Sequence, residues 1–143
     1  MQNRINTLAD FIGVNENAIK ADDWQENAFI NVLDDSRYFV FTDNEADKSA
    51  AEMIKESLWA FNADFILNCC GLETTNSVIF SLRSMQAESC EDCNALILAL
   101  INGTCGFDSF VEKAINADGR GHFISGYDGI EEENNGYYIY RID

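Results

Sequence analysis

The spacing of apolar residues in the first third of the chain predicts short helices followed by a strand. It indicates a helix over residues 5–12 and a weaker one over 16–20. The apolar positions of residues 24–33, which include Trp24, also recur at a helical period. Residues 37–42, RYFVFT, form a short segment rich in aromatic and β-branched side chains, which predicts a strand.

The strand pattern ends in TDNE, residues 42–45, which has the form of a helix capping box. In a capping box the Thr42 hydroxyl accepts a hydrogen bond from the Glu45 N–H, and the Glu45 carboxylate reaches back to the first residue. The helix that follows is predicted over about 43–68, because its apolar residues recur every three to four positions, and Gly71 is expected to end it.

Three more helices are predicted, over 76–86, over 92–102 and between Asp108 and Gly119. The segment 92–102 contains ALILALI, which is apolar nearly all round and therefore predicts a central, buried helix. Asp108 is expected to cap the last helix. Gly119 is expected to end it, because glycine adopts a positive φ without strain.

The C-terminal part alternates as strands do. Residues 122–125 and 137–142 predict two strands with a long connection rich in Gly and Asn. In the second strand Tyr138 and Tyr140 share one face and the intervening residues share the other. Together with 37–42 they predict a small, mainly antiparallel three-stranded sheet in a helix-rich α+β fold.

The length and composition favour one folded domain over residues 1–143. The chain is 47% hydrophobic and 12% aromatic, which is enough apolar material for a core. No apolar run approaches the roughly 20 residues that span a bilayer, and the N-terminal residues lack the pattern of a signal peptide. We therefore expect a soluble, cytoplasmic protein.

The cysteines predict reduced thiols, because their number is odd and no signal peptide precedes them. They are Cys69, Cys70, Cys90, Cys93 and Cys105. Cys90 and Cys93 form a lone CxxC, and the remaining cysteines have the wrong spacing for a zinc ribbon. The acidic pair between them raises the pKa of a thiol, which disfavours redox use. We expect no metal and no cofactor.

The chain is strongly acidic, with 25 Asp and Glu against 9 Lys and Arg and a net charge of −16 at pH 7. Residues 22–64 alone carry −8. Phosphate groups are bound by Lys and Arg, so direct binding to nucleic acid or to anionic lipid is disfavoured. A basic partner protein, itself a nucleic-acid binder, fits this charge. The alternative is that the acidic surface serves only solubility.

Carboxylates four residues apart on a helix are separated by about 6 Å along its axis. Phosphates along a DNA strand are spaced comparably, so a row of such carboxylates can imitate nucleic acid toward a basic groove. We predict that the partner is bound by Asp43, Asp47, Glu52, Glu56, Asp64, Glu131, Glu132 and Glu133.

Three sequence stretches carry a family resemblance: FTDNEAD at 41–47, GRGHFISGYDGIEEE at 119–133 and YYIYRID at 137–143. With them the chain resembles, over about residues 37–68 and 106–143, a family of small acidic uncharacterised proteins of tailed phages and prophages. Gly126 departs from the family pattern, which has Ser or a similar small residue there. The resemblance implies a phage or mobile-element origin and a place in the host cytoplasm, but no mechanism.

Combined with the charge, this resemblance leads us to expect an interaction protein without catalytic activity. It would bind a basic host protein surface, as an anti-defence protein (anti-CRISPR or anti-restriction) that mimics nucleic acid does.

The stretch DGRGHFISGYDG at 118–129 contains the only histidine and offers an alternative function. Arg120 and nearby backbone amides can bind an anion, and Asp128 can orient the imidazole of His122 as a base. With Tyr127 these residues would form a module that binds a small molecule or nucleotide. No recognised catalytic motif accompanies them.

The same stretch is equally explained as a structural junction between a helix and a hairpin. Gly119 would end the helix, and Tyr127 with Asp128 would form the turn. His122 would begin a strand and bond to Tyr138 or Tyr140 across it.

Overall fold

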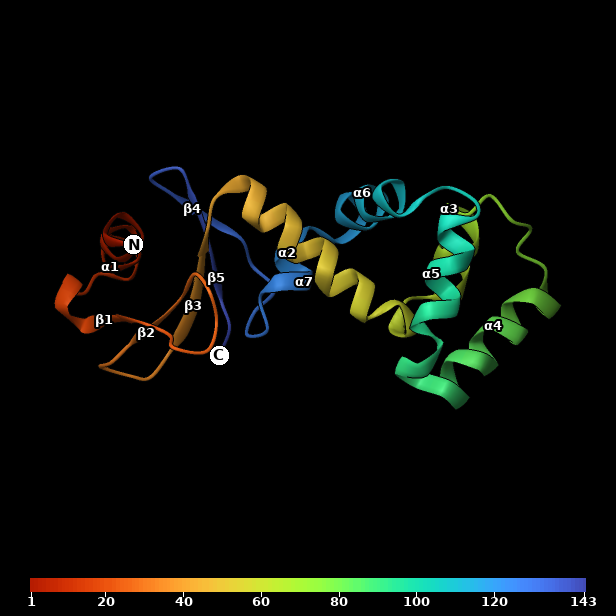
Figure 1. Ribbon diagram of the computed structural model, residues 1–143, viewed down its shortest axis with the longest axis horizontal. Coiled ribbons are helices and arrows are strands. Elements are labelled where there is room, and N and C mark those ends of the chain that lie inside the picture. The colour runs from red at the N-terminus through yellow and green to blue at the C-terminus, as the bar shows by residue number, and fades with distance from the viewer. The chain divides into compact units, whose positions relative to one another are not determined.

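The computed structural model describes residues 1–143 and has an α+β fold (Figure 1). The chain divides into two compact units, residues 1–50 with 118–143 and residues 51–117, and each is described by itself. In chain order the elements are α1 (Gln2–Ile12), η1 (Glu16–Ala18), β1 (Ile19–Ala21), β2 (Ala28–Asn31), β3 (Arg37–Phe41), α2 (Asp43–Glu56), η2 (Leu58–Ala60), α3 (Ala63–Cys69), α4 (Asn76–Ser89), η3 (Cys90–Cys93), α5 (Asn94–Asn102), α6 (Phe107–Asp118), α7 (Arg120–Ile124), β4 (Glu132–Asn134) and β5 (Tyr137–Arg141). That the whole chain is one domain stays a prediction.

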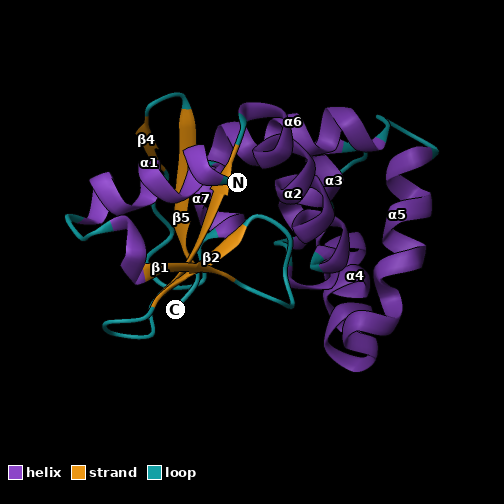
Figure 2. Cartoon of the chain, turned by 60° about the vertical axis from the view of Figure 1, so that its left-hand side comes forward, coloured by secondary structure: helices purple, strands orange, loops and turns teal.

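The first unit contains an antiparallel sheet of five strands in the order β1-β2-β3-β5-β4 (Figure 2). The strands predicted at 37–42 and 137–142 are confirmed as β3 and β5, which pair directly with Val40 opposite Ile139. The predicted number of three strands is wrong, because β1, β2 and β4 extend the sheet on both sides.

The two faces of the sheet are formed by alternate residues, as the strand pattern predicts. On one face Leu8 of α1 packs into a buried cluster with Val40 and Ile139. The opposite face carries Phe41 and Tyr140, whose ring centres are 5.9 Å apart. Tyr140 is fully buried and Phe41 is nearly so, and the sheet is therefore covered on both sides at its centre.

The helix predicted over 24–33 is wrong, and this segment is a loop followed by β2. Asn27 and Asp35 flank the strand with φ of 58° and 61°, a left-handed conformation that Asn and Asp tolerate and that ends any regular helix. Strand β2 pairs with β1 and with β3, which provides partners for its backbone on both sides. Likewise, the helix expected over 16–20 is the single turn η1 followed by β1.

The strand predicted at 122–125 is also wrong, because these residues belong to the short helix α7 or follow it. Gly119 ends α6 as predicted, with φ of 83°. The C-terminal hairpin is instead formed by β4 and β5. Its two-residue loop is Asn135-Gly136, and both residues have a positive φ, as a type I′ turn requires.

The second unit is entirely helical, and the helix predicted over 43–68 is interrupted within it. Helix α2 ends at Glu56, and the side chain of Asn62 caps α3 by accepting hydrogen bonds from two backbone N–H groups of its first turn. Leu58 and Ile66, on either side of the break, are both fully buried. The apolar stripe thus continues across the interruption, and for this reason the periodicity does not reveal it.

The helices predicted at 76–86 and 92–102 correspond to α4 and α5. Helix α5 is not central, however. Ile97 and Ile101 are buried, whereas Leu96 is 60% exposed, because this helix packs by one face although it is apolar on all sides. No single helix is long and apolar enough to cross a membrane. The helices of 76–102 and 107–118 meet that test only as a pair, which is bent by 106°.

Candidate functional site

Arg120, at the start of α7, binds three of the carboxylates that the sequence assigned to a partner. Its Nε and Nη2 donate to Glu131 at 2.9 and 3.1 Å, and its Nη1 donates to Asp43 at 2.8 Å and to Asp47 at 3.0 Å. The guanidinium lies 4.6 Å from the ring centre of Tyr138, and only 11% of the side chain is exposed. This cluster joins α7, the start of α2 and the C-terminal hairpin inside the first unit.

The Arg120 cluster continues to the buried phenol of Tyr140, which donates a hydrogen bond to Glu131. Burial raises the pKa of Tyr140, and the bond to the carboxylate raises it further. Burial alone would also raise the pKa of Glu131, but the hydrogen bonds from Arg120 and Tyr140 lower it below its ordinary value. Glu131 therefore stabilises the fold as a carboxylate.

A second arginine completes the predicted capping box. The Thr42 N–H donates to the Glu45 carboxylate at 2.9 Å, and the Glu45 N–H approaches the Thr42 hydroxyl at 3.4 Å, which confirms the motif. Arg4 of α1 adds two hydrogen bonds to Glu45, at 2.6 and 2.9 Å, and one to the carbonyl of Val40. The hydrogen bond from Arg4 lowers the pKa of Glu45.

The other three arginines are also engaged within the protein. Arg37 lies 3.4 Å from Asp22 and 3.7 Å from Asp143, and Arg83 lies 3.7 Å from Asp64. Arg141 stacks on the ring of Tyr127 at 3.8 Å and donates to the Asp143 carbonyl. Four of the five arginines thus donate hydrogen bonds within the protein, which makes them poor ligands for an external phosphate, and Arg83 has only its exposed pair with Asp64.

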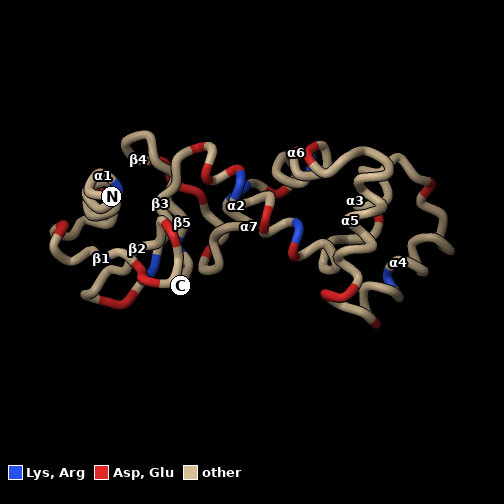
Figure 3. Tube along the Cα trace, viewed as in Figure 1, with Lys and Arg blue, Asp and Glu red and all other residues tan.

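The remaining carboxylates form an exposed acidic surface. Seven of the 25 Asp and Glu side chains take part in the ion pairs above, and the other 18 are in no ion pair and are all exposed. The only cations left to balance them are the four lysines, which are exposed as well. Figure 3 shows that the acidic positions occur in both units.

The predicted partner-binding residues fall into two groups. Glu52 and Glu56 on α2 and Glu132 and Glu133 on the edge strand β4 are exposed and in no ion pair. The others are paired, Asp43, Asp47 and Glu131 with Arg120 and Asp64 with Arg83. The five predicted residues from Asp43 to Asp64 do not form a row on one helix, because α2 ends at Glu56 and Asp64 lies on α3.

The residues of the alternative ligand site make separate contacts. Arg120 is bound in its carboxylate cluster, and Tyr127 stacks with Arg141. Asp128 accepts a hydrogen bond from the backbone N–H of residue 130, and its carboxylate lies 2.9 Å from the Ser125 hydroxyl. The ring of His122 is exposed and lies edge-on against Phe123, so the predicted contact with Tyr138 or Tyr140 is wrong. Both tyrosines are used by the Arg120 cluster instead.

The glycines of this stretch explain its sequence as a structural junction. A Cβ atom at Gly121 would lie 2.5 Å from the carbonyl oxygen of Gly129, and one at Gly126 would lie 2.9 Å from the carbonyl oxygen of Ile142. Ser125, which is buried, donates to the Arg141 carbonyl and fixes the same crossing. Close backbone packing therefore requires glycine at two of these positions.

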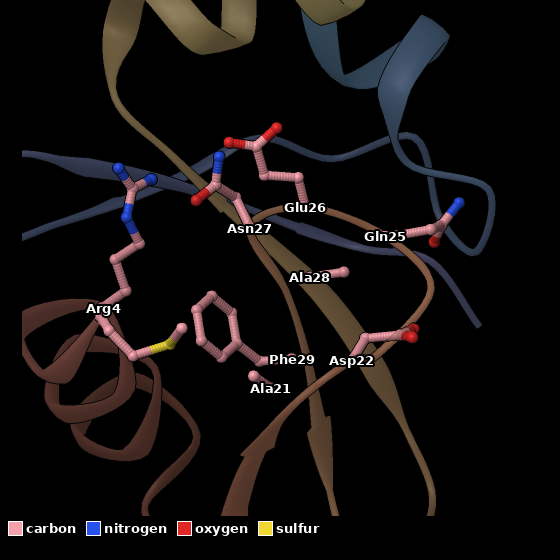
Figure 4. Close-up of a pocket in the computed structure, with 9 residues that line it drawn as sticks. Arg4, Ala21, Asp22, Gln25, Glu26, Asn27, Ala28 and Phe29 are labelled. Carbon is pink, nitrogen blue, oxygen red and sulfur yellow. The ribbon is translucent and has the colours of Figure 1, made fainter.

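The most exposed large apolar side chain, Trp24, was missed, because the helical period suggested a buried face. It is 93% exposed in the loop between β1 and β2. The same loop lines a pocket of about 320 Å³ together with Arg4 and Phe29 (Figure 4). The segment ADDWQEN at 21–27 could have indicated this exposure, because the residues on either side of Trp24 in the sequence are polar.

The five cysteines are free thiols. Burial raises the pKa of Cys69, Cys70 and Cys93, which disfavours the reactive thiolate. No three His, Cys, Asp or Glu side chains are arranged to hold a metal ion. That the protein binds no metal stays a prediction. Comparisons of the chain with protein-family models, curated proteins and solved structures found no match.

Proposed function

We propose that this chain is an interaction protein whose acidic surface binds a basic protein, of the kind that itself binds nucleic acid. The observation that carries the proposal is the division of its charges. Four of the five arginines are held by hydrogen bonds within the protein, while 18 exposed carboxylates are left in no ion pair. Such a surface attracts Lys and Arg on a partner and repels phosphates.

The exposed members of the predicted set are the best candidates for direct contacts. Glu52 and Glu56 are four residues apart on α2, which places them about 6 Å apart along the helix axis. Glu132 and Glu133 lie on β4, an edge strand, where charges also serve to prevent strand-to-strand aggregation. A test must therefore separate specific binding from general solubility.

The resemblance to phage proteins suggests which partner to look for. A host defence nuclease or a CRISPR complex presents a basic groove for nucleic acid, and a phage gains by occupying it. In this proposal the carboxylates take the place of phosphates, and binding competes with DNA or RNA.

The test is capture of partners from bacterial lysate on the immobilised protein, in low and high salt, with identification by mass spectrometry. We expect basic nucleic-acid-binding proteins to be retained at low salt and released by salt or by duplex DNA. A variant with glutamine at Glu52, Glu56, Glu132 and Glu133 should lose this retention.

A matched control has glutamine at Glu73, Glu88, Glu91 and Glu112, which are also exposed and in no ion pair. It changes the net charge equally but leaves the proposed contact residues intact, so it should retain the partner. Equal loss in both variants, or no retained partner at any salt, would show that the acidic surface serves only solubility.

A further inference from the structure

Trp24 is an exposed aromatic side chain in a folded loop, and folding does not account for its position. Its exposed fraction of 93% is the highest among the large apolar residues, whereas tryptophan is usually well buried. Tryptophan is also among the residues that most often dominate the binding energy of protein interfaces.

The loop that carries Trp24 is held in place on both sides. The backbone N–H of Trp24 donates to the Asp22 carboxylate at 2.8 Å, and the backbone N–H of Asp22 donates to the Ala28 carbonyl at 2.9 Å. The Asp22 side chain is only 4% exposed and lies 3.4 Å from Arg37, which also donates to Gln25 at 2.6 Å. The indole is thus presented from an ordered backbone, which lowers the entropy lost on binding.

The charges beside Trp24 are negative and unpaired. Asp23 and Glu26 lie on the same loop, are exposed and take part in no ion pair. In the adjoining pocket, Glu26 and the guanidinium of Arg4 both line the cavity (Figure 4), but Arg4 is already neutralised by Glu45. The π face of an indole carries partial negative charge, so the loop as a whole attracts a cation.

We infer that Trp24 is the anchor of the interface and receives an arginine side chain of the basic partner on its indole ring, beside Asp23 and Glu26. This inference rests on the proposed function, and it adds where the basic partner makes contact and through which type of side chain. Arginine fits best, because its planar guanidinium stacks on an aromatic ring while it donates to carboxylates.

Two other occupants fit the loop less well. An apolar partner would have to bury Asp23 and Glu26 without a counter-charge, which is costly. A second copy of this chain would add its own net charge of −16, and the repulsion between two such surfaces opposes their association.

The test measures binding of a ten-residue arginine peptide and a ten-residue lysine peptide by calorimetry at 50 and 150 mM salt. The parent should bind the arginine peptide more tightly. Trp24→Leu should weaken arginine-peptide binding about two- to five-fold and remove the preference over lysine, while Trp24→Phe should retain most of both. Because the side chain is exposed, these variants should keep the parent's circular dichroism spectrum.

Leu33→Ala is the matched control. Leu33 is 70% exposed on the loop after β2 and precedes Asp34 and Asp35, so it is an exposed apolar residue beside acids without a π face. It should leave both affinities unchanged. If Trp24→Leu binds both peptides as the parent does, the inference that Trp24 is the anchor is wrong. The proposed function would survive that result, because the acidic surface would still bind cations. If the parent binds neither peptide at 50 mM salt, the anchor and the proposed function are both overturned.

Discussion

Replacing Arg120 by methionine tests whether its carboxylate cluster stabilises the first unit. The variant removes the charge and the donors but keeps most of the side-chain volume. Glu131, whose side chain is 29% exposed, would lose two charge-assisted hydrogen bonds and keep only the one from Tyr140. Each hydrogen bond to a charged group contributes about 1.5–3 kcal/mol, and part of that is lost here to solvent.

The other partners of Arg120 contribute less. The side chains of Asp43 and Asp47 are 65% and 60% exposed, so each pair is screened by water and adds about 0.2–1 kcal/mol. Stacking on Tyr138 adds about 0.5–1 kcal/mol. We expect Arg120→Met to lower the unfolding free energy by about 3 kcal/mol, with partial recovery when Glu131→Gln removes the unpaired charge.

The assay is urea unfolding at pH 7 followed by circular dichroism. With a slope of about 1–3 kcal/mol per molar urea, the loss of about 3 kcal/mol corresponds to a midpoint about 1–3 M lower. Arg83→Met is the control, because Arg83 and Asp64 are 3.7 Å apart and 58% and 45% exposed, and it should cost under about 0.5 kcal/mol. Equal midpoints for the two variants would refute the reasoning that the burial of Arg120 gives its ion pairs their strength.

Three further predictions concern the same unit. Because the fold lowers the pKa of Glu45 and Glu131 below the ordinary 4.5, their ionised forms stabilise it above about pH 4.5, and this contribution is lost as the pH falls below that value. The difference in unfolding free energy between the parent and a variant with glutamine at both positions should therefore be constant from pH 7 to about 5 and shrink below it; a constant difference down to pH 3 would contradict this. Gly119→Val should lower the unfolding free energy by about 1–2 kcal/mol, because a β-branched residue is strained at a φ of 83° although the space around it is open. Gly121→Ala should lower it more, because its Cβ would overlap neighbouring backbone atoms. Thermal melts that rank the two variants in the reverse order would contradict this reasoning. His122→Ala should change the unfolding free energy by less than about 0.5 kcal/mol, because the ring is exposed. If this variant melts like the parent but no longer binds the partner, His122 is a binding residue rather than part of the structural junction.

The sequence by itself determined the features that depend on residues a few positions apart. The Thr42–Glu45 capping box, the end of α6 at Gly119 and the alternation of β5 are all local, because one hydrogen bond or one backbone dihedral angle specifies each. The α+β class follows from the same local patterns. The acidic net charge is a property of the composition, so it too could be read from the sequence without the structure.

Only the tertiary structure decided which charges remain free and which apolar residues are buried. Arg120 meets Asp43 and Asp47 across 77 and 73 positions, and no spacing in the sequence shows that these carboxylates are neutralised. Trp24 fits the apolar period of a buried helical face, yet the pairing of β2 with β1 and β3 places this residue in an exposed loop. Local patterns fix how a segment can fold, whereas burial and ion pairing depend on which distant segments pack against it.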